Sequence, residues 1–228
     1  MQDLSPPLQA LTHLFEQHAH AEQARQMRAY LKDKFDMYGI KTPLRRQLSK
    51  EFIQLWRKAN ERIPTSLLLQ LWAMPQREYQ YVALDLLDKY KRSSRPEDLQ
   101  LFETLILDKS WWDTVDALAS HQVGWLFLRH GELIDAATAK WMDSGNMWLQ
   151  RTCLLYQLGY KNQTNWPRLQ SYILTLASSR EFFLRKAIGW ALRQYAKTDP
   201  EAVKAFVHTH SHSLAPLSIR EALKGLKA

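Results

Sequence analysis

Residues 181–198 read EFFLRKAIGWALRQYAKT, and in this stretch polar and apolar positions separate into two clear sets. The apolar positions that recur at helical spacing are Leu184, Ala187, Ile188, Ala191, Leu192 and Tyr195. Such a stripe predicts a helix that buries one face against its neighbours. Arg185, near the start of this helix, also belongs to a longer pattern that runs through the chain.

Six polar residues recur at nearly constant intervals of 35, 35, 35, 34 and 35 residues. They are Arg46, Tyr81, Asp116, Arg151, Arg185 and Arg220. In most repeats small or aliphatic residues follow two or three positions later, so each unit reuses one helix pattern. A period of this length without strand signals predicts a stack of helical hairpins. We therefore expect an all-α solenoid of about six repeats, with equivalent residues along one curved, basic face.

The composition supports this class. Of 228 residues, 46% are hydrophobic and only 7 are glycine. The chain is therefore poor in the glycine that the tight turns between short strands require. The segment KYKRSSRPED, residues 89–98, is the most linker-like, but it fits an ordinary loop between repeats. We therefore expect one domain over residues 1–228.

The helices expected from periodicity and capping signals are short and closely connected. Their ranges are 7–20, 22–37, 43–58, 64–73, 78–91, 96–107, 111–129, 131–142, 147–160, 165–177, 181–197, 199–209 and 216–226.

The net charge of +8 favours a polyanionic partner, although many basic proteins bind no nucleic acid. The single cysteine, Cys153, cannot form an internal disulfide and fits a reducing compartment. No run approaches the roughly 20 apolar residues that span a bilayer, and the first 20 residues lack the pattern of a signal peptide. We expect a cytoplasmic, monomeric protein.

Residues 109–116, KSWWDTVD, hold two carboxylates with different roles. Ser110 and Asp113 have the spacing of a capping box, so Asp113 is expected to hold the helix start. Asp116 lies beyond the first turn and follows Trp112 by four residues, which places both on one helical face. Asp116 and Trp112 are therefore the better candidates for chemistry.

Arg151 lies one repeat after Asp116 and is the only charged residue between Met147 and Tyr160. In one interpretation the two form a structural ion pair between layers. In the other, Arg151 reaches a phosphate and leaves Asp116 free to stabilise a developing positive charge. The spacing favours neither, and both can hold at different stages of binding.

A second face of the 181–197 helix carries Lys186, Trp190, Arg193 and Lys197. Tryptophan among cations on a polar stripe fits either partial packing against a loop or a flat surface that meets a nucleotide while the cations hold phosphates. Arg45 is expected to extend such a track as an exposed cation, although a single surface charge is more often only solvated.

Other features carry no chemistry. His208, His210 and His212 alternate near a helix end, but no carboxylate or thiol lies nearby in sequence to complete a metal site. Cys153 has apolar neighbours, and no serine lies on a glycine-rich turn, so nucleophilic catalysis has no support. No phosphate-binding glycine loop is present, and we expect neither a metal nor a cofactor.

Over almost its whole length the chain resembles the AlkD-like DNA alkylation repair family, whose members are HEAT-like repeat DNA glycosylases. The matching segments are IKTPLRRQL (40–48), KSWWDTVD (109–116), WLQR (148–151), EFFLRKAIGWALRQYAKT (181–198) and LAPLSIREA (214–222). The resemblance implies that Trp112, Asp116 and Trp190 occupy active-site positions. It also implies that Arg151 contacts phosphate and positions substrate, and that Tyr30 lies near DNA.

The resemblance implies hydrolysis of the N-glycosidic bond of purines alkylated at N3 or N7 in duplex DNA, without strand cleavage. Such a base is already cationic and leaves readily, so the difficult species is the oxocarbenium-like sugar. Asp116 is suited to stabilise that cation and orient water, while the faces of Trp112 and Trp190 favour positive charge. The alternative is a catalytically silent repeat module that uses the same basic face to bind DNA or another polyanion.

Overall fold

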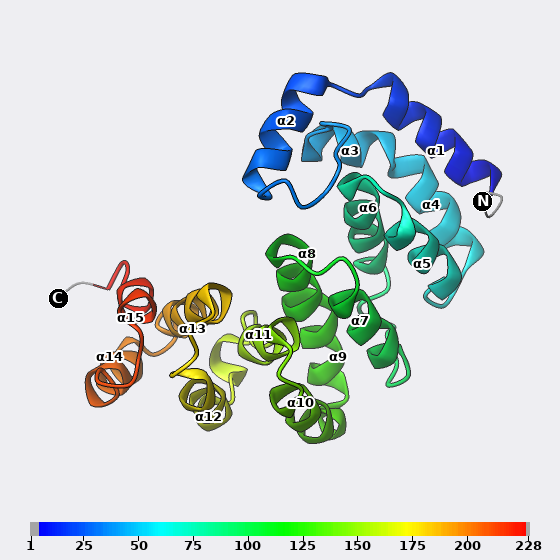
Figure 1. The fold of residues 1–228 in the computed structure, drawn as a ribbon. Coiled ribbons are helices and arrows are strands. Elements are labelled where there is room, and N and C mark those ends of the chain that lie inside the picture. The colour runs from blue at the N-terminus through cyan, green and yellow to red at the C-terminus, as the bar shows by residue number, and fades with distance from the viewer. Residues whose placement is uncertain (1–4, 227–228) are drawn as a thin grey trace. The chain divides into compact units, whose positions relative to one another are not determined.

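The computed structural model describes residues 5–226, and the regular elements in that range are all helical (Figure 1). The all-α, helical-repeat class is therefore confirmed. The chain divides into two compact units, residues 1–94 and 95–228, each considered by itself below. The division falls inside the 89–98 segment that the sequence suggests is an ordinary loop. A single domain and a continuous basic concave face, which would need both units, stay predictions.

The first unit consists of helical pairs joined by short turns. Its helices are α1 (Pro6–Gln17), α2 (Ala21–Tyr30), α3 (Thr42–Leu48), α4 (Lys50–Ala59), α5 (Thr65–Ala73) and α6 (Arg77–Leu87). Leu8, Leu68 and Leu86 are fully buried in its core. The helix expected over 43–58 is wrong as one element, because the chain turns at Ser49 and continues as α4.

The helix expected over 22–37 also ends early, at Tyr30. Lys32 and Asp33 have φ angles of 60° and 53°, in the left-handed region that side chains with a Cβ rarely adopt. The following segment is held by Glu78 of α6, whose buried carboxylate accepts hydrogen bonds from the backbone N–H groups of residues 38, 39 and 40 at 2.9–3.1 Å. Tertiary anchoring therefore overrides helix propensity here.

The second unit continues the pattern of short antiparallel helices. Its elements are α7 (Asp98–Leu107), α8 (Trp112–Ala117), the π-helical turn η1 (Leu118–Val123), α9 (Gly124–Arg129), the 3₁₀ turn η2 (Gly131–Leu133), α10 (Ile134–Asp143), α11 (Met147–Leu155), the 3₁₀ turn η3 (Lys161–Gln163), α12 (Trp166–Leu176), α13 (Phe182–Tyr195), α14 (Pro200–Thr209) and α15 (Pro216–Ala222). Asp199 is the N-cap of α14, and its carboxylate accepts a hydrogen bond from Ala202 N at 2.9 Å ahead of Pro200.

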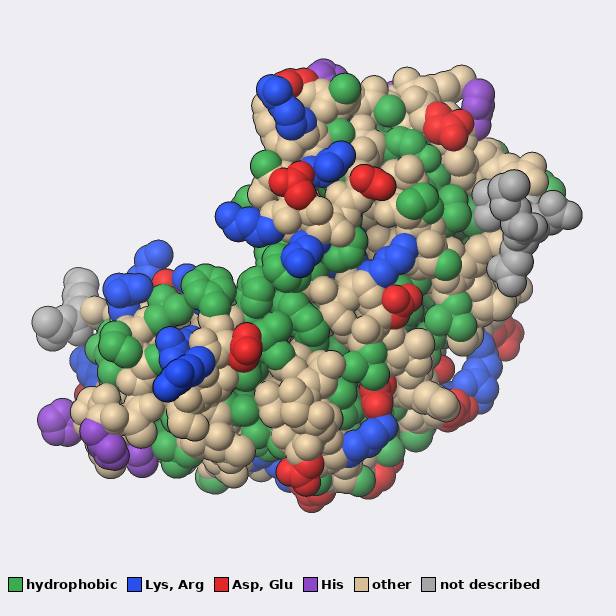
Figure 2. Space-filling view, in the orientation of Figure 1, with side chains coloured by type: hydrophobic (Ala, Val, Ile, Leu, Met, Phe, Trp, Pro, Cys, Tyr) green, Lys and Arg blue, Asp and Glu red, His purple; other side chains and the backbone are tan. Residues whose placement is uncertain are grey.

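Ion pairs within each unit join helices about one repeat apart. The pairs are Arg45–Asp85, Glu103–Lys140, Asp116–Arg151, Asp135–Arg168 and Lys186–Glu221, with separations of 40, 37, 35, 33 and 35 residues. The 35-residue sequence period thus corresponds to side chains that meet between neighbouring layers. On the face in Figure 2, Lys and Arg side chains are interspersed with acidic ones.

Candidate active site

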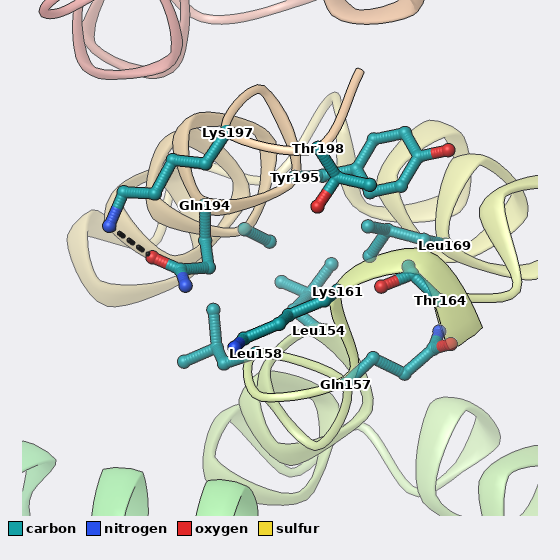
Figure 3. A pocket seen from close by; sticks show the side chains of 11 residues that line it. Leu154, Gln157, Leu158, Lys161, Thr164, Leu169, Gln194, Tyr195, Lys197 and Thr198 are labelled. Atoms are coloured by element: carbon teal, nitrogen blue, oxygen red, sulfur yellow. Dashed lines mark hydrogen bonds between the residues drawn. The ribbon is translucent and has the colours of Figure 1, made fainter. Parts of the chain in front are cut away.

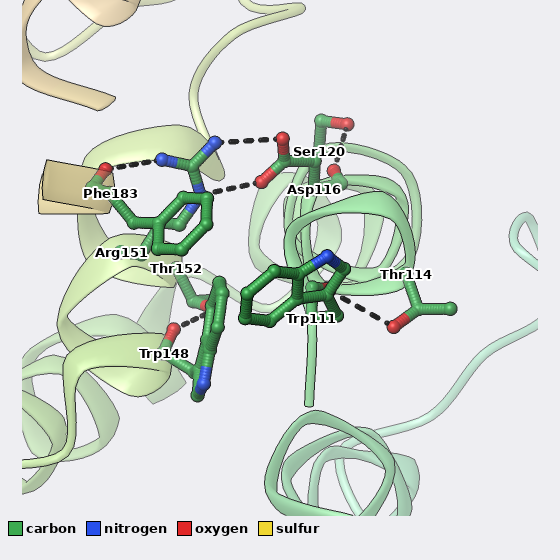
Figure 4. A network of polar contacts seen from close by, with 8 residues as sticks. All are labelled: Trp111, Thr114, Asp116, Ser120, Trp148, Arg151, Thr152 and Phe183. Atoms are coloured by element: carbon green, nitrogen blue, oxygen red, sulfur yellow. Dashed lines mark hydrogen bonds and ion pairs between the residues drawn. The ribbon is translucent and has the colours of Figure 1, made fainter. Parts of the chain in front are cut away.

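Asp116 and Arg151 form a bidentate ion pair between α8 and α11 (Figure 4). Arg151 Nε lies 2.7 Å from Asp116 Oδ1, and Arg151 Nη2 lies 2.8 Å from Oδ2. The Arg151 side chain is 5% exposed and that of Asp116 is 15% exposed. Two parallel charge-assisted bonds in a poorly hydrated site fix the carboxylate plane far better than one contact to a lysine would.

A third contact fixes the guanidinium from the other side. Arg151 Nη1 donates to the backbone carbonyl of Phe183 in α13 (Figure 4). The Phe183 ring packs against Trp111 and Trp148, with centroid distances of 5.0 and 5.1 Å. Residues of α8, α11 and α13 thus surround the pair and leave a small part of the Asp116 side chain open to solvent.

The chain directly after Asp116 is unusual. Residues 118–123 form a π-helical turn, and Ser120 Oγ donates to the Asp116 carbonyl at 2.7 Å. At the end of this turn Gly124 meets the carbonyl of Tyr156, where a Cβ would lie only 2.5 Å away. Isolated π turns inside α-helices often occur at functional sites. Here the turn and Gly124 allow the segment that carries Asp116 to pack closely on the end of α11.

Burial raises the pKa of Asp116 above its ordinary value, while the hydrogen bonds and charge of Arg151 oppose that rise. The nearby Asp113 charge adds a smaller upward contribution. A carboxylate that is costly to desolvate but held by one arginine is well placed to interact strongly with a cation that approaches its exposed edge.

Trp112 and Trp190 are both partly exposed. Trp112 is the first residue of α8, one turn before Asp116. Trp190 lies on α13 seven residues after Phe183, whose carbonyl accepts from Arg151. A spacing of seven residues is two helical turns, so Trp190 and Phe183 share a face of α13.

The expected capping box at the start of α8 is wrong. Trp111 is the N-cap residue, and Ser110 Oγ instead donates to the carbonyl of Ile106 at 2.6 Å. Asp113 does lie in the first turn of α8, where the positive end of the helix dipole stabilises its negative charge.

Two cations of the α13 stripe are paired with α15. Lys186 and Arg193 both pair with Glu221 of α15, at 3.0 and 2.7 Å. Glu221 is a functional candidate that the predictions above lack, although its separation of 35 residues from Lys186 matches the repeat and indicates the pairing. Phe183 was missed because a backbone carbonyl carries no sequence signal.

Lys197 lies apart from that cluster, two residues beyond the end of α13. It borders a pocket of about 180 Å³ lined by α13 and by the turn after α11 (Figure 3). Its Nζ donates to Gln194 Oε1 at 2.8 Å. Asp116 does not line this pocket, so it is separate from the candidate active site.

In the first unit, Tyr30 is 70% exposed at the end of α2. Arg45 differs from the exposed cation expected from the sequence. It is 6% exposed, its Nη2 donates to Asp85 at 2.8 Å, and its guanidinium lies 4.9 Å from the Tyr81 ring centroid. Arg46 is the outward member of this cluster, with a side chain that is 63% exposed.

The features without expected chemistry have ordinary surroundings. Cys153 is buried and its thiol pKa is raised by desolvation, so the reactive thiolate is disfavoured. Histidine side chains gather over α14 in Figure 2, but residues 5–226 contain no cluster of three His, Cys, Asp or Glu side chains arranged to hold a metal. Within the described part of the chain, no helix has the length and apolar character needed to cross a membrane.

Comparison with known proteins places these elements in one family. The model of the DNA alkylation repair enzyme family matches residues 11–226. Among solved structures, the chain is similar to one described as a predicted DNA alkylation repair enzyme from Enterococcus faecalis, with 34% sequence identity and a TM-score of 0.84. That similarity covers 92% of this chain and 97% of the other. No curated protein matches. The family match over nearly the whole chain establishes that this protein belongs to the DNA alkylation repair enzyme family.

Proposed function

We propose that the protein is a monofunctional DNA glycosylase that hydrolyses the N-glycosidic bond of cationic N3- or N7-alkylated purines in duplex DNA. The observation that carries the proposal is the enclosed Asp116–Arg151 pair, which holds one carboxylate with a fixed orientation and a partly open edge. Membership of the DNA alkylation repair enzyme family supports a role for the protein, and for this carboxylate, in the repair of alkylated DNA.

Charge stabilisation is the main catalytic contribution in this proposal. The alkylated base leaves with its bonding electrons and becomes neutral, so it needs no proton from the enzyme. Positive charge develops on the sugar, where Asp116 stabilises it and orients the attacking water. Trp112 and Trp190 present electron-rich ring faces to the cationic base or sugar. Water adds to the sugar carbon and gives up a proton, which leaves an abasic site and the free base.

Arg151 has two roles in this scheme. Its three contacts to Asp116 and Phe183 use three of the five guanidinium N–H groups, so the number of donors permits a further bond to a DNA phosphate, although the side chain is only 5% exposed. In this proposal Arg151 positions both the carboxylate and the substrate strand. Tyr30, Lys186, Arg193 and Lys197 add contacts to the DNA backbone or to exposed bases. The paired and buried Arg45 supports the fold of the first unit and is not part of this DNA-binding set.

Product analysis tests the proposed reaction. A duplex that contains one N7-methylguanine is incubated with excess protein, and the products are separated before and after treatment with alkali. We expect free N7-methylguanine and a strand that breaks only after alkali, as simple hydrolysis requires. Strand cleavage without alkali would contradict the monofunctional assignment, and intact substrate would contradict the glycosylase itself.

The second candidate function is a silent DNA-binding module. The observation that favours it is that interlayer ion pairs also occur where no chemistry is expected, as between Asp135 and Arg168. Under that function, Asp116 and Arg151 only hold adjacent layers together. Tight DNA binding without base release is the result that would favour it.

A further inference from the structure

Glu221 of α15 joins the two cations that flank Trp190 on α13. Its Oε1 accepts from Lys186 Nζ at 3.0 Å and its Oε2 accepts from Arg193 Nη1 at 2.7 Å. Lys186 and Trp190 are separated by four residues, and Trp190 and Arg193 by three. One carboxylate therefore spans the stretch of helix on which Trp190 lies.

The packing of α13 on α15 makes this arrangement possible. A Cβ at Gly189 would lie 2.5 Å from Glu221 Cβ and 2.9 Å from the Ser218 carbonyl, so only glycine permits this approach. On the same side, Ser218 Oγ donates to the Arg185 carbonyl at 2.8 Å. The backbone thus places Glu221 directly beside the cationic stripe.

The three charges are only partly shielded from water. The side chains of Lys186, Arg193 and Glu221 are 38%, 30% and 17% exposed. Hydrogen bonding from Lys186, followed by that from Arg193, lowers the pKa of Glu221, so the carboxylate is ionised at neutral pH. The cluster therefore carries a net charge of +1, because the negative charge of Glu221 offsets one of the two positive charges that a phosphate would meet.

We propose that Glu221 restrains Lys186 and Arg193 and so limits binding of the protein to undamaged DNA. The inference rests on the proposed function in one respect, namely that this face of α13 meets DNA. Phosphate contacts are the same in damaged and undamaged duplex, so uncompensated cations would strengthen both complexes without regard to the lesion. A carboxylate that offsets the cations therefore lowers the part of the binding free energy that does not depend on the lesion.

The size of the effect follows from counterion release. One additional effective phosphate contact changes the slope of log affinity against log salt concentration by about −0.9. At about 0.1 M salt this corresponds to roughly eightfold tighter binding. Glu221→Gln removes one negative charge from the cluster with little change in side-chain size, so we expect changes of about this magnitude for undamaged duplex.

The test measures binding of undamaged duplex DNA to the natural protein and to Glu221→Gln over a range of salt concentrations. The matched control is Glu201→Gln, which removes the same charge from an exposed pair with Lys204 on α14. We expect tighter binding and a steeper slope for Glu221→Gln, with little change in either quantity for Glu201→Gln. Equal changes in the two variants would show a general charge effect and overturn the proposal.

A second set of variants distinguishes restraint of the two cations by Glu221 from a purely structural role of Glu221. In a protein that already carries Lys186→Gln and Arg193→Gln, Glu221→Gln should no longer strengthen binding. If the gain persists there, or if Glu221→Gln weakens binding in the natural background, the proposal fails. Absence of DNA binding by every variant overturns it as well. Because binding is measured on undamaged DNA, these outcomes are independent of whether the protein releases alkylated bases.

Discussion

Replacement of Arg151 by Gln tests how the buried pair controls Asp116. The substitution removes the charge and both bonds of the bidentate contact, at 2.7 and 2.8 Å, while Asp116 stays only 15% exposed. Breaking a buried pair by removal of one partner costs about 3–5 kcal/mol. The partial exposure of Asp116 favours the lower limit, so we expect the free energy of unfolding to fall by about 3 kcal/mol at neutral pH.

The same substitution changes the pH dependence in a definite direction. Burial already raises the pKa of Asp116 above 3.8, and Arg151 is the main opposing influence. A hydrogen bond to a charged group is worth about 1.5–3 kcal/mol. Loss of these bonds therefore moves the pKa of Asp116 further upward. In the proposed mechanism base release needs ionised Asp116, so the acid limb of the rate should move to higher pH.

Two assays measure these effects. Urea unfolding at neutral and mildly acidic pH gives the stability difference, which should shrink in acid because a protonated Asp116 no longer needs a counterion. Single-turnover base release from pH 5 to 8 gives the acid limb. The control is Arg168→Gln, whose partner Asp135 is 85% exposed, and we expect a cost below about 1 kcal/mol. Equal stability losses in the two variants, or an acid limb that does not move, would refute the reasoning.

The other predictions concern packing. Gly189→Ala places a Cβ 2.5 Å from Glu221 Cβ and should cost about 1–3 kcal/mol in urea unfolding. Gly159→Ala, with nothing within 4 Å of its added Cβ, should cost far less, and similar costs for both would contradict the close approach of α13 and α15. Glu78→Gln places an amide donor against backbone N–H groups of residues 38–40 and should cost about 2–3 kcal/mol. Amide hydrogen exchange should rise first in that segment, and unchanged protection there would contradict the anchoring role.

Much of the second unit could be predicted because each helix carries its own local signals. The 181–197 helix has an apolar stripe without interruption, and the structure forms α13 over Phe182–Tyr195. Asp199 and Pro200 mark the start of α14 in the same local way. The Asp116–Arg151 pair could be predicted as one of two alternatives, because a 35-residue separation in a helical repeat brings side chains of neighbouring layers together.

The differences arise where distant residues decide the backbone. The residues near Lys32 carry no helix-end signal, because the segment that follows is held by Glu78, which lies more than 40 residues after Lys32 in the sequence. The π turn after Asp116 inserts one extra residue into a helix whose apolar spacing looks continuous, so periodicity cannot locate it. The burial of Arg45 depends on Asp85 of a neighbouring helix, and the sequence shows only one more basic residue in a basic segment.

The most direct test of the central claim is the single-turnover rate of N7-methylguanine release from duplex DNA by the natural protein, Asp116→Asn and Asp113→Asn. The last variant is the matched control, because it removes a carboxylate from the same helix. Loss of the charge that stabilises the sugar cation should lower the rate by about 10²- to 10³-fold in Asp116→Asn. Asp113→Asn should stay within a few-fold of the natural protein, and DNA binding should be retained by both variants. Release by Asp116→Asn at the rate of the natural protein would contradict the central role of this carboxylate.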